Sequence, residues 1–287
     1  MTQPSTISIA RLSPKVCKIK FSNPPTNLIV PETVNRLHEV VKELSEDENV
    51  QVVIFSSTVF GYFFNHFDLD EAGKFPMLAG VEGMPTWIDL VVRLSKAPFI
   101  SIASIRGRTR GGGNELALAC DLRYASREHA VFGQPEVGIG ILPSGGCSER
   151  LPRLIGRDRG LEAILSSDDY DADLAERYGW VTRPIPDEEL DRFVEGMVSR
   201  LALFDKSALA AAKAQVNRVT LPPDADLLMA HGEYVESLTW AVDQARLPLL
   251  RMHIAEKGIE KVESRLGYYI GLTNQPPFIW RSLLLRP

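Results

Sequence analysis

The sequence is poor in cysteine and has no long apolar run. Three cysteines occur in 287 residues, and none belongs to a CxxC pair. A chain of this length can build its own core, so a disulfide framework is not indicated. We expect Cys17, Cys120 and Cys147 to be reduced thiols, with Cys120 in the core and Cys147 either buried or reactive. No stretch approaches the roughly 18 apolar residues of a membrane-spanning helix.

An excess of positive charge and a metal-binding pattern are also missing. The formal net charge of −5 gives no electrostatic reason to bind nucleic acid or an anionic membrane. The five histidines show no HxxxH spacing, so we predict no metal site and no cofactor of the nicotinamide or flavin type. The first residues lack the basic and apolar regions of a secretory signal. We therefore expect a cytoplasmic protein that binds neither nucleic acid nor membranes.

Strand and helix patterns alternate along most of the chain. Residues 6–22, 50–57 and 98–107 have the alternating or short apolar character of strands. Residues 31–47 and 85–95 carry apolar side chains at helical spacing. This alternation continues to about residue 185 and predicts an α/β architecture.

After residue 185 the patterns become helical. They cover residues 187–204, 206–219, 224–244 and 246–260. We therefore predict a helical C-terminal region. The apolar tail, residues 268–287, is interrupted by Pro-Pro and is a docking segment, a poorly ordered end or a cloning remnant.

Three glycines stand directly before an amphipathic segment in "TRGGGNELALACD", residues 109–121. A turn between a strand and a helix leaves the first backbone N–H groups of the helix unpaired and partly positive. Glycine lets a ligand approach those N–H groups closely. The stretch lacks both the GK[ST] of a P-loop and the GxGxxG of a dinucleotide site. The glycines therefore serve close packing, a phosphate site or an oxyanion site.

Four further stretches complete a recognisable series. They are "NPPTNLI" at 23–29, "FFNHFDLDE" at 63–71, "FGQPEVGIGILPSGG" at 132–146 and "ERYGWVTRPIP" at 176–186. With the glycine triplet they resemble the blocks of the crotonase superfamily, the enoyl-CoA hydratase/isomerase family. The resemblance extends over roughly residues 8–260.

The resemblance implies an α/β fold, a spiral of ββα units followed by a helical C-terminal trimerisation subdomain. We therefore divide the chain into a core with the active site at residues 1–204 and a helical oligomerisation region at 205–287. The expected assembly is a homotrimer or a dimer of trimers. The implied substrate is an acyl-CoA thioester of the kind used in fatty acid metabolism, with coenzyme A as part of the substrate and no further cofactor.

The resemblance also implies an oxyanion hole for the thioester carbonyl. Its two donors correspond to the backbone N–H groups of Phe67 and Gly112. The expected substrate or CoA contacts are Asn27, Leu28, His66, Asp68 and Gly111. For Asp68 a structural role is the stronger expectation.

Two glutamates match the catalytic pair of the family's hydratases. Taken alone, the position of Glu115 is typical of a partner of the helix dipole and that of Glu136 of a solvated loop residue. Together, beside both glycine blocks, they indicate general acid–base catalysis. By resemblance, Glu115 would activate water and Glu136 would protonate the α-carbon, or deprotonate it in reverse. The implied activity is therefore hydration of a 2-enoyl-CoA.

Several residues depart from the family pattern. His66 replaces a glycine and is either a packed or surface histidine, or an acid or base that reaches the substrate. Phe67 is bulky where alanine is usual. Arg106, Arg108 and Arg110 form surface ion pairs or bind an extra carboxylate or phosphate of the ligand. An enoyl-CoA isomerase, a C–C bond hydrolase and a non-catalytic or nucleic-acid-binding relative therefore remain alternatives.

Overall fold

The computed structural model describes residues 6–75 and 83–274, and its centre is a six-stranded sheet. The strands of this sheet are β1 (Thr6–Ser13), β2 (Val16–Ser22), β3 (Val52–Ser57), β4 (Ile100–Ile105), β6 (Leu122–Ser126) and β9 (Arg183–Ile185). Their order is β1-β2-β3-β4-β6-β9, and only the first pair is antiparallel. The predicted strand region 6–22 is thus a hairpin of two strands.

A smaller, three-stranded sheet lies beside the large one, and the chain enters it after β4 and again after β6. It contains β5 (Arg108–Arg110), β7 (Val131–Gly133) and β8 (Asp169–Asp171), in the order β5-β7-β8. Strand β5 follows β4 and leads into helix α3 (Gly112–Ala119), after which β6 returns to the large sheet and β7 to the small one. This succession of strand, strand and helix confirms the predicted α/β spiral of ββα units.

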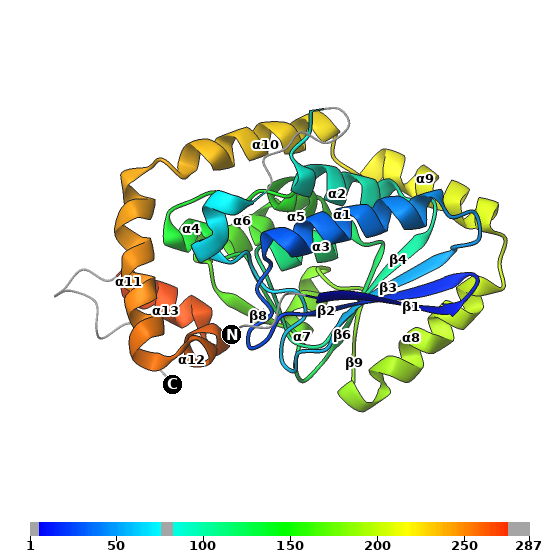
Figure 1. Cartoon of the computed structure of the whole chain (residues 1–287), viewed down its shortest axis with the longest axis horizontal. Coiled ribbons are helices and arrows are strands. Elements are labelled where there is room, and N and C mark those ends of the chain that lie inside the picture. Colours follow the sequence, from blue (N-terminus) through cyan, green and yellow to red (C-terminus); the bar gives the residue numbers. More distant parts are fainter. Residues whose placement is uncertain (1–5, 76–82, 275–287) are drawn as a thin grey trace.

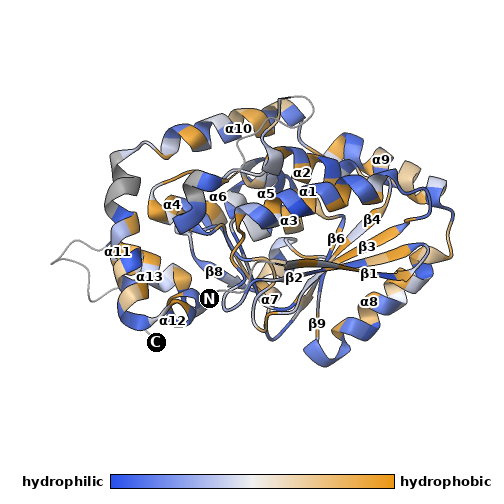
Figure 2. Ribbon diagram, viewed as in Figure 1, coloured by the Kyte–Doolittle hydropathy of each residue, from blue (hydrophilic) through white to orange (hydrophobic). Residues whose placement is uncertain are grey.

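Helices cover both faces of the large sheet (Figure 1). On one face lie α1 (Pro31–Glu46), α2 (Thr86–Lys96), α3 and α5 (Cys147–Ile155), and on the other lies α8 (Asp187–Ala202). Alternate residues of β3 divide between the two faces, because successive side chains of a strand point to opposite sides. Val53 and Phe55 pack with the α1 and α2 side, whereas Val52 and Ile54 pack against α8. Strand β3 is therefore apolar from Val52 to Phe55, and Figure 2 shows the same apolar character on β3 and β4 in the middle of the sheet.

Four short helices lie between the larger elements of the core along the described chain. They are η1 (Leu69–Lys74), α4 (Glu136–Ile139), α6 (Arg157–Ser166) and α7 (Ala172–Tyr178). The C-terminal helices are α9 (Lys206–Thr220), α10 (Asp224–Ser237), α11 (Ala241–Lys257), α12 (Ile259–Ser264) and α13 (Leu266–Thr273). In Figure 1, α10 runs along one edge and α11 turns so that α11, α12 and α13 lie beside α4. A separate apolar cluster, which includes Ile139, Leu266 and Ile270, joins these elements.

The predicted helical C-terminal region is confirmed, although several of its boundaries differ, and α11 begins at Ala241 rather than at residue 246. The predicted helix 224–244 ends at Ser237, where the N–H of Leu238 bonds back to the last turn. The next helix ends at Lys257 because Gly258 follows with a φ of +86°. Tyr269 of the predicted tail is buried in α13, and residues 275–287 of that tail lie outside the described residues. The domain boundary at residue 204 falls between α8 and α9, and the division into two domains stays a prediction.

None of the described helices is both long and apolar enough to span a membrane. Cys17, Cys120 and Cys147 are free and buried. Burial strongly raises the pKa of the Cys147 thiol. Of its two expected states, buried or reactive, the structure therefore supports the buried one.

Candidate active site

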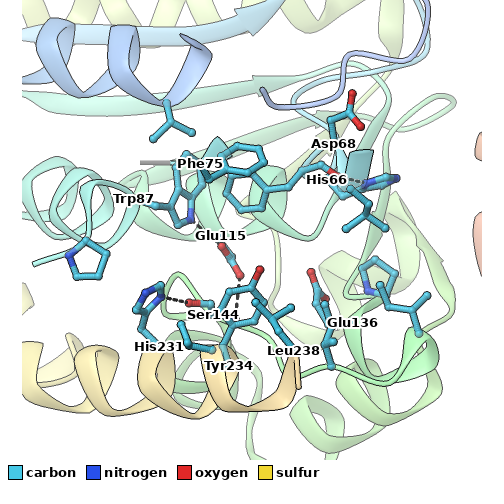
Figure 3. A pocket seen from close by; sticks show the side chains of 18 of the residues that line it. His66, Asp68, Phe75, Trp87, Glu115, Glu136, Ser144, His231, Tyr234 and Leu238 are labelled. Carbon is cyan, nitrogen blue, oxygen red and sulfur yellow. Dashed lines mark hydrogen bonds between the residues drawn. The ribbon is translucent and has the colours of Figure 1, made fainter. Parts of the chain in front are cut away.

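A pocket lies between the core helices and the C-terminal helices. Its walls come from the segment leading into η1, from α2, α3 and α4, and from α10, α11 and α13. Most of the lining is apolar or aromatic. The polar side chains that Figure 3 shows around it include His66, Glu115, Glu136, Ser144 and His231. An apolar cavity with a few convergent polar groups is the expected form of a small-molecule site.

Glu115 lies in the first turn of α3, where only 2% of the residue is exposed. Its Oε2 accepts a hydrogen bond from the indole Nε1 of Trp87 at 2.7 Å, and its Oε1 accepts one from the backbone N–H of Ser144 at 3.2 Å. Burial and the nearby charge of Glu136 raise the pKa of Glu115 to about 8, although both hydrogen bonds oppose this shift. Glu115 is therefore a protonated carboxylic acid at neutral pH.

Glu136 begins α4 and points into the same space as Glu115 (Figure 3). Its Oε2 is buried and has no hydrogen-bond partner among the described residues. Burial raises the pKa of Glu136 to about 7, and the charge of His66 opposes the rise. The two carboxyl groups thus face one apolar cavity with raised pKa values, and the lower of the two values belongs to Glu136.

The peptide bond between His66 and Phe67 is oriented so that the N–H group of Phe67 points away from the neighbouring segment at Ile29. The carbonyl of His66 accepts a hydrogen bond from the N–H of Ile29 at 2.9 Å. In a trans peptide the N–H points opposite to the carbonyl, so the Phe67 N–H points away from Ile29. Within the described residues, this N–H donates to no other backbone group.

The glycine triplet packs directly against the segment that carries Phe67. The N–H of Gly113 bonds to the carbonyl of Asn65 at 3.0 Å, and a Cβ on Gly113 would stand 1.8 Å from the carbonyl oxygen of Phe64. A Cβ on Gly112 would stand 2.7 Å from the Phe67 ring. Close backbone approach therefore requires glycine at position 113, whereas at position 112 an added Cβ would meet the side-chain ring of Phe67. The Gly112 N–H, at the first position of α3, has no partner among the described backbone groups.

His66 is tied to the protein at both ring nitrogens. Its Nδ1 lies 2.8 Å from the carbonyl oxygen of Phe67, and its Nε2 lies 2.9 Å from Oε1 of Glu263 in α12. Of the two expected roles, the structure supports the packed histidine, because neither ring nitrogen is left to act on a substrate.

The three arginines before the glycine triplet all contact protein groups. Arg106 pairs with Asp187 and Asp191 of α8. Arg108 bonds to the carbonyl oxygens of Gly61 and Ser264 and lies over the Tyr62 ring. Arg110, with 1% of its side chain exposed, binds Asp169 through two hydrogen bonds of 2.7 Å and also contacts Glu263. None of the three lines the pocket, so the structure supports ion pairs rather than ligand binding.

The predicted CoA-loop residues lie outside the lining of the pocket. Asn27 is buried with a φ of +55°; its Oδ1 accepts from the N–H of Asn23, and its Nδ2 donates to Ser57 and to the carbonyl of Phe63. Its side chain therefore shapes the loop, and Leu28 follows it there. Asp68, by contrast, lines the pocket, and its side chain also caps η1 by accepting a hydrogen bond from the N–H of Asp70. CoA contacts of Asn27 and Leu28 stay a prediction.

Sequence reasoning did not find four polar groups of this region. Trp87 and Ser144 bind Glu115, His231 binds Ser144, and Glu263 binds His66. Each stands in a stretch with an ordinary helical or loop pattern, so no local signal marks it. In the described part of the chain, no group of three or more His, Cys, Asp or Glu side chains is placed to hold a metal.

The spiral fold and the pocket with its paired glutamates define an enzyme of the crotonase superfamily. A family model for enoyl-CoA hydratase/isomerase matches residues 11–241. The chain therefore belongs to the enoyl-CoA hydratase/isomerase family.

Its relatives carry names of the same kind. The chain is 32% identical, over 67% of its length and 68% of the other's, to "Probable enoyl-CoA hydratase, mitochondrial" of Dictyostelium discoideum. It is 29% identical, over 71% of its length and 78% of the other's, to "Short-chain-enoyl-CoA hydratase" of Clostridium acetobutylicum. A crystal structure of a "putative enoyl-CoA hydratase" from Streptomyces avermitilis is 41% identical, with a TM-score of 0.88 over 94% of this chain and 98% of that one.

Proposed function

We propose that the protein is an enoyl-CoA hydratase, which adds water across the double bond of a 2-enoyl-CoA thioester. The observation that carries this proposal is the pair of carboxyl groups, Glu115 and Glu136, that face one apolar pocket. Water addition needs a base that takes a proton from water and an acid that gives a proton to the α-carbon. Two carboxyl groups that hold one proton between them meet both needs. The names of the relatives support the same substrate class.

Each glutamate then has a distinct role. In hydration, Glu115 removes a proton from water as the hydroxyl oxygen bonds to the β-carbon, and Glu136 delivers its proton to the α-carbon. In dehydration, Glu136 removes the α-proton and Glu115 protonates the leaving hydroxyl. In each hydration Glu136 gives one proton to the α-carbon and Glu115 takes one from water, so the pair holds one proton before and after the reaction, but on opposite groups. The free enzyme, with Glu115 protonated, is poised for dehydration.

The negative charge that develops on the thioester oxygen needs donors. We assign these to the N–H groups of Phe67 and Gly112, which have no backbone partner within the described residues. Loss of one donor of this kind typically costs about 10²–10³ in turnover. The substrate or CoA contacts expected of Gly111 belong to the same proposal.

The first experiment replaces each glutamate by glutamine. With a short trans-2-enoyl-CoA, we expect Glu115→Gln and Glu136→Gln each to lose roughly 10²–10⁴ in hydration rate. Hydration is followed by the loss of the conjugated thioester absorbance, and calorimetry with the saturated acyl-CoA checks that both variants still bind. If Glu115→Gln hydrates at the rate of the native protein, the hydratase proposal fails. Absence of acyl-CoA binding by the native protein would instead favour a non-catalytic relative.

One observation favours a second activity, the shift of a double bond in an enoyl-CoA. The Oε2 of Glu136 is free of hydrogen bonds, whereas Trp87 and Ser144 hold both oxygens of Glu115. A single mobile carboxylate suffices to move a proton between two carbons. An isomerase would keep its activity on a 3-enoyl-CoA in Glu115→Gln and lose it in Glu136→Gln. The C–C hydrolase alternative loses support, because His66 has both ring nitrogens engaged.

We also propose a homotrimer or a dimer of trimers. Large apolar side chains remain exposed on and beside α9 and α10. Among them are Leu203, Val216, Val219, Met229 and Trp240. Exposed apolar side chains that gather on neighbouring elements are typical of a protein interface.

A further inference from the structure

The hydrogen bonds of His66 define its protonation state. Its Nδ1 meets the carbonyl oxygen of Phe67, which can only accept, and its Nε2 meets the carboxyl group of Glu263. A neutral imidazole has a single N–H, whereas an imidazolium has two. If Glu263 is ionised, both bonds require the imidazolium.

Glu263 is an ionised carboxylate buried at the edge of the active site. Only 1% of the residue is exposed. Although burial favours the neutral acid, the charge and hydrogen bond of His66, the charge of Arg110 and the amide of Asn65 lower the pKa of Glu263 to about 2. Asn65 donates from Nδ2 at 2.8 Å, and Nη1 of Arg110 lies 3.5 Å away. His66 therefore carries a positive charge; burial opposes this charge, but Glu263 raises the pKa of the imidazole.

The His66 cation stands beside Glu136. A Cβ placed on Gly111 would lie 2.7 Å from Oε1 of Glu136 and 3.0 Å from Cβ of His66, so Glu136 and the base of the His66 side chain both approach that glycine. The charge of His66 lowers the pKa of Glu136 against the effect of burial. This charge is fixed in place, because Glu263 binds one end of the ring and Phe67 the other.

The other charged groups near this cluster do not replace His66. Arg110, on β5, faces both His66 and Glu263, but two hydrogen bonds hold its guanidinium to Asp169. Among the described residues, Glu115 has no cation as a hydrogen-bond partner, since its two donors are the indole of Trp87 and a backbone N–H. Two further charges act near Glu115: Glu149 raises its pKa, and the buried guanidinium of Arg150, which donates to the carbonyl of Gly145, interacts with it electrostatically. Glu136 instead has the His66 cation as its neighbouring charge.

We propose that His66 and Glu263 are a positioning pair, in which Glu263 holds the His66 imidazolium beside Glu136 so that Glu136 is the ionised glutamate and the proton resides on Glu115. This inference rests on the proposed function, because it concerns the same two glutamates. It gives α12 a part in the active site, although Glu263 does not line the pocket.

The test is the pH profile of kcat/KM for dehydration of a short 3-hydroxyacyl-CoA. The acid limb of this profile reports the ionisation of the base Glu136 in the free enzyme. Removal of the cation raises the pKa of Glu136, so in His66→Gln we expect the acid limb to move to higher pH by roughly one unit. Glu263→Gln should move it in the same direction. Because the two residues act as a unit, the double variant should move it no further than either single change.

The control is Asp169→Asn, which disturbs the same charge cluster but leaves His66 and Glu263 in place. This variant should keep the acid limb where it is or move it to lower pH. The proposal is overturned if His66→Gln and Glu263→Gln lower kcat/KM equally at every pH, or if Asp169→Asn reproduces their shift.

Folding and the proposed function are checked separately. Circular dichroism and thermal melts identify a variant that fails to fold, and the other single variant then carries the test. Glu136→Gln distinguishes the two proposals. If Glu136→Gln retains full activity, the proposed function itself fails. If Glu136→Gln is inactive while the acid limb of His66→Gln stays unmoved, only the positioning pair fails.

Discussion

At the scale of single residues, the site contains two carboxyl groups, Glu115 and Glu136, whose burial disfavours the ionised form. Glu115 lies in an apolar pocket with only two hydrogen-bond donors, and burial is the main cause of its raised pKa. Glu136 experiences the same burial but also the charge of His66. One neighbouring charge can decide which of the two glutamates carries a shared proton. A pKa difference of one unit corresponds to about 1.4 kcal/mol, which is a tenfold preference for one of the two sites.

The raised pKa of Glu115 predicts a pH-dependent cost in stability. The pKa of this carboxyl is about 8 in the folded protein against its ordinary value of 4.5, so the folded state holds the proton more tightly than the unfolded state. Its contribution to stability is therefore complete below about pH 4.5 and is lost as the pH rises through 8. Because glutamine does not ionise, Glu115→Gln removes this pH-dependent loss of folding stability. We expect the free energy of unfolding of Glu115→Gln, relative to the native protein, to improve by at least about 1 kcal/mol between pH 5 and pH 9.

Chemical denaturation at the two pH values measures this difference. The amide that Glu115→Gln introduces lacks one of the two acceptor oxygens at both pH values, so that cost cancels in the comparison. An unchanged difference between the two proteins would show that the Glu115 carboxyl is not held neutral by the fold.

At the scale of elements, the glycine triplet and the C-terminal helices close the pocket from opposite sides. The triplet brings the start of α3 against residues 63–67, and α13 covers the side next to α4. Ile270 of α13 lines the pocket, is 3% exposed and packs so closely on α4 that a Cβ on Gly138 would stand 2.3 Å from its Cγ2. This packing makes α13 the limit of the pocket on that side, and under the proposed function α13 would limit the space for the acyl chain.

Shortening this side chain should therefore change the preference for acyl length. In Ile270→Ala we expect the ratio of kcat/KM for a long-chain over a short-chain 2-enoyl-CoA to rise roughly 10-fold, because methylenes gain room. The free energy of unfolding should fall by about 2–5 kcal/mol, as for other buried aliphatic truncations. Tyr268→Ala changes the more exposed face of the same helix and should leave the ratio unchanged. If Ile270→Ala and Tyr268→Ala gave the same ratio of kcat/KM values, the end of the acyl chain would not lie against Ile270.

Several elements were predictable from sequence because their patterns are strong. The helix at 31–47 is α1 with one residue less, and its apolar residues Val34, Leu37 and Val41 are all buried as the spacing requires. The boundary between α10 and α11 was not predictable, because both sides carry similar helical spacing. Likewise, Glu263 gave no signal, since only the approach of α12 to the loop at His66 makes it part of a charge pair.

At the scale of the whole molecule, exposed apolar side chains on α9 and α10 distinguish one face of the chain. Val216 and Val219 project from α9 with 58% and 84% exposure. A single protomer leaves these side chains in water, which an interface between copies would correct.

Light scattering after size exclusion tests this assembly. We expect the native protein to show three or six times the protomer mass of 31.9 kDa. Val216→Asp combined with Val219→Asp should lower that mass, because two charges would be buried in the interface. Leu165→Asp, at an exposed apolar residue of α6, serves as the control and should leave the mass unchanged. A native protein of protomer mass contradicts the proposal.

The sequence by itself determined the class of fold, the glycine triplet and the two glutamates, since periodicity and local motifs are short-range properties. Only the tertiary structure decided what surrounds those glutamates. Trp87, His66 and Glu263 come from three distant parts of the chain, and their effect depends on distances that no local pattern encodes. Burial and neighbouring charge set the pKa of a carboxyl group, and both exist only once the chain has folded.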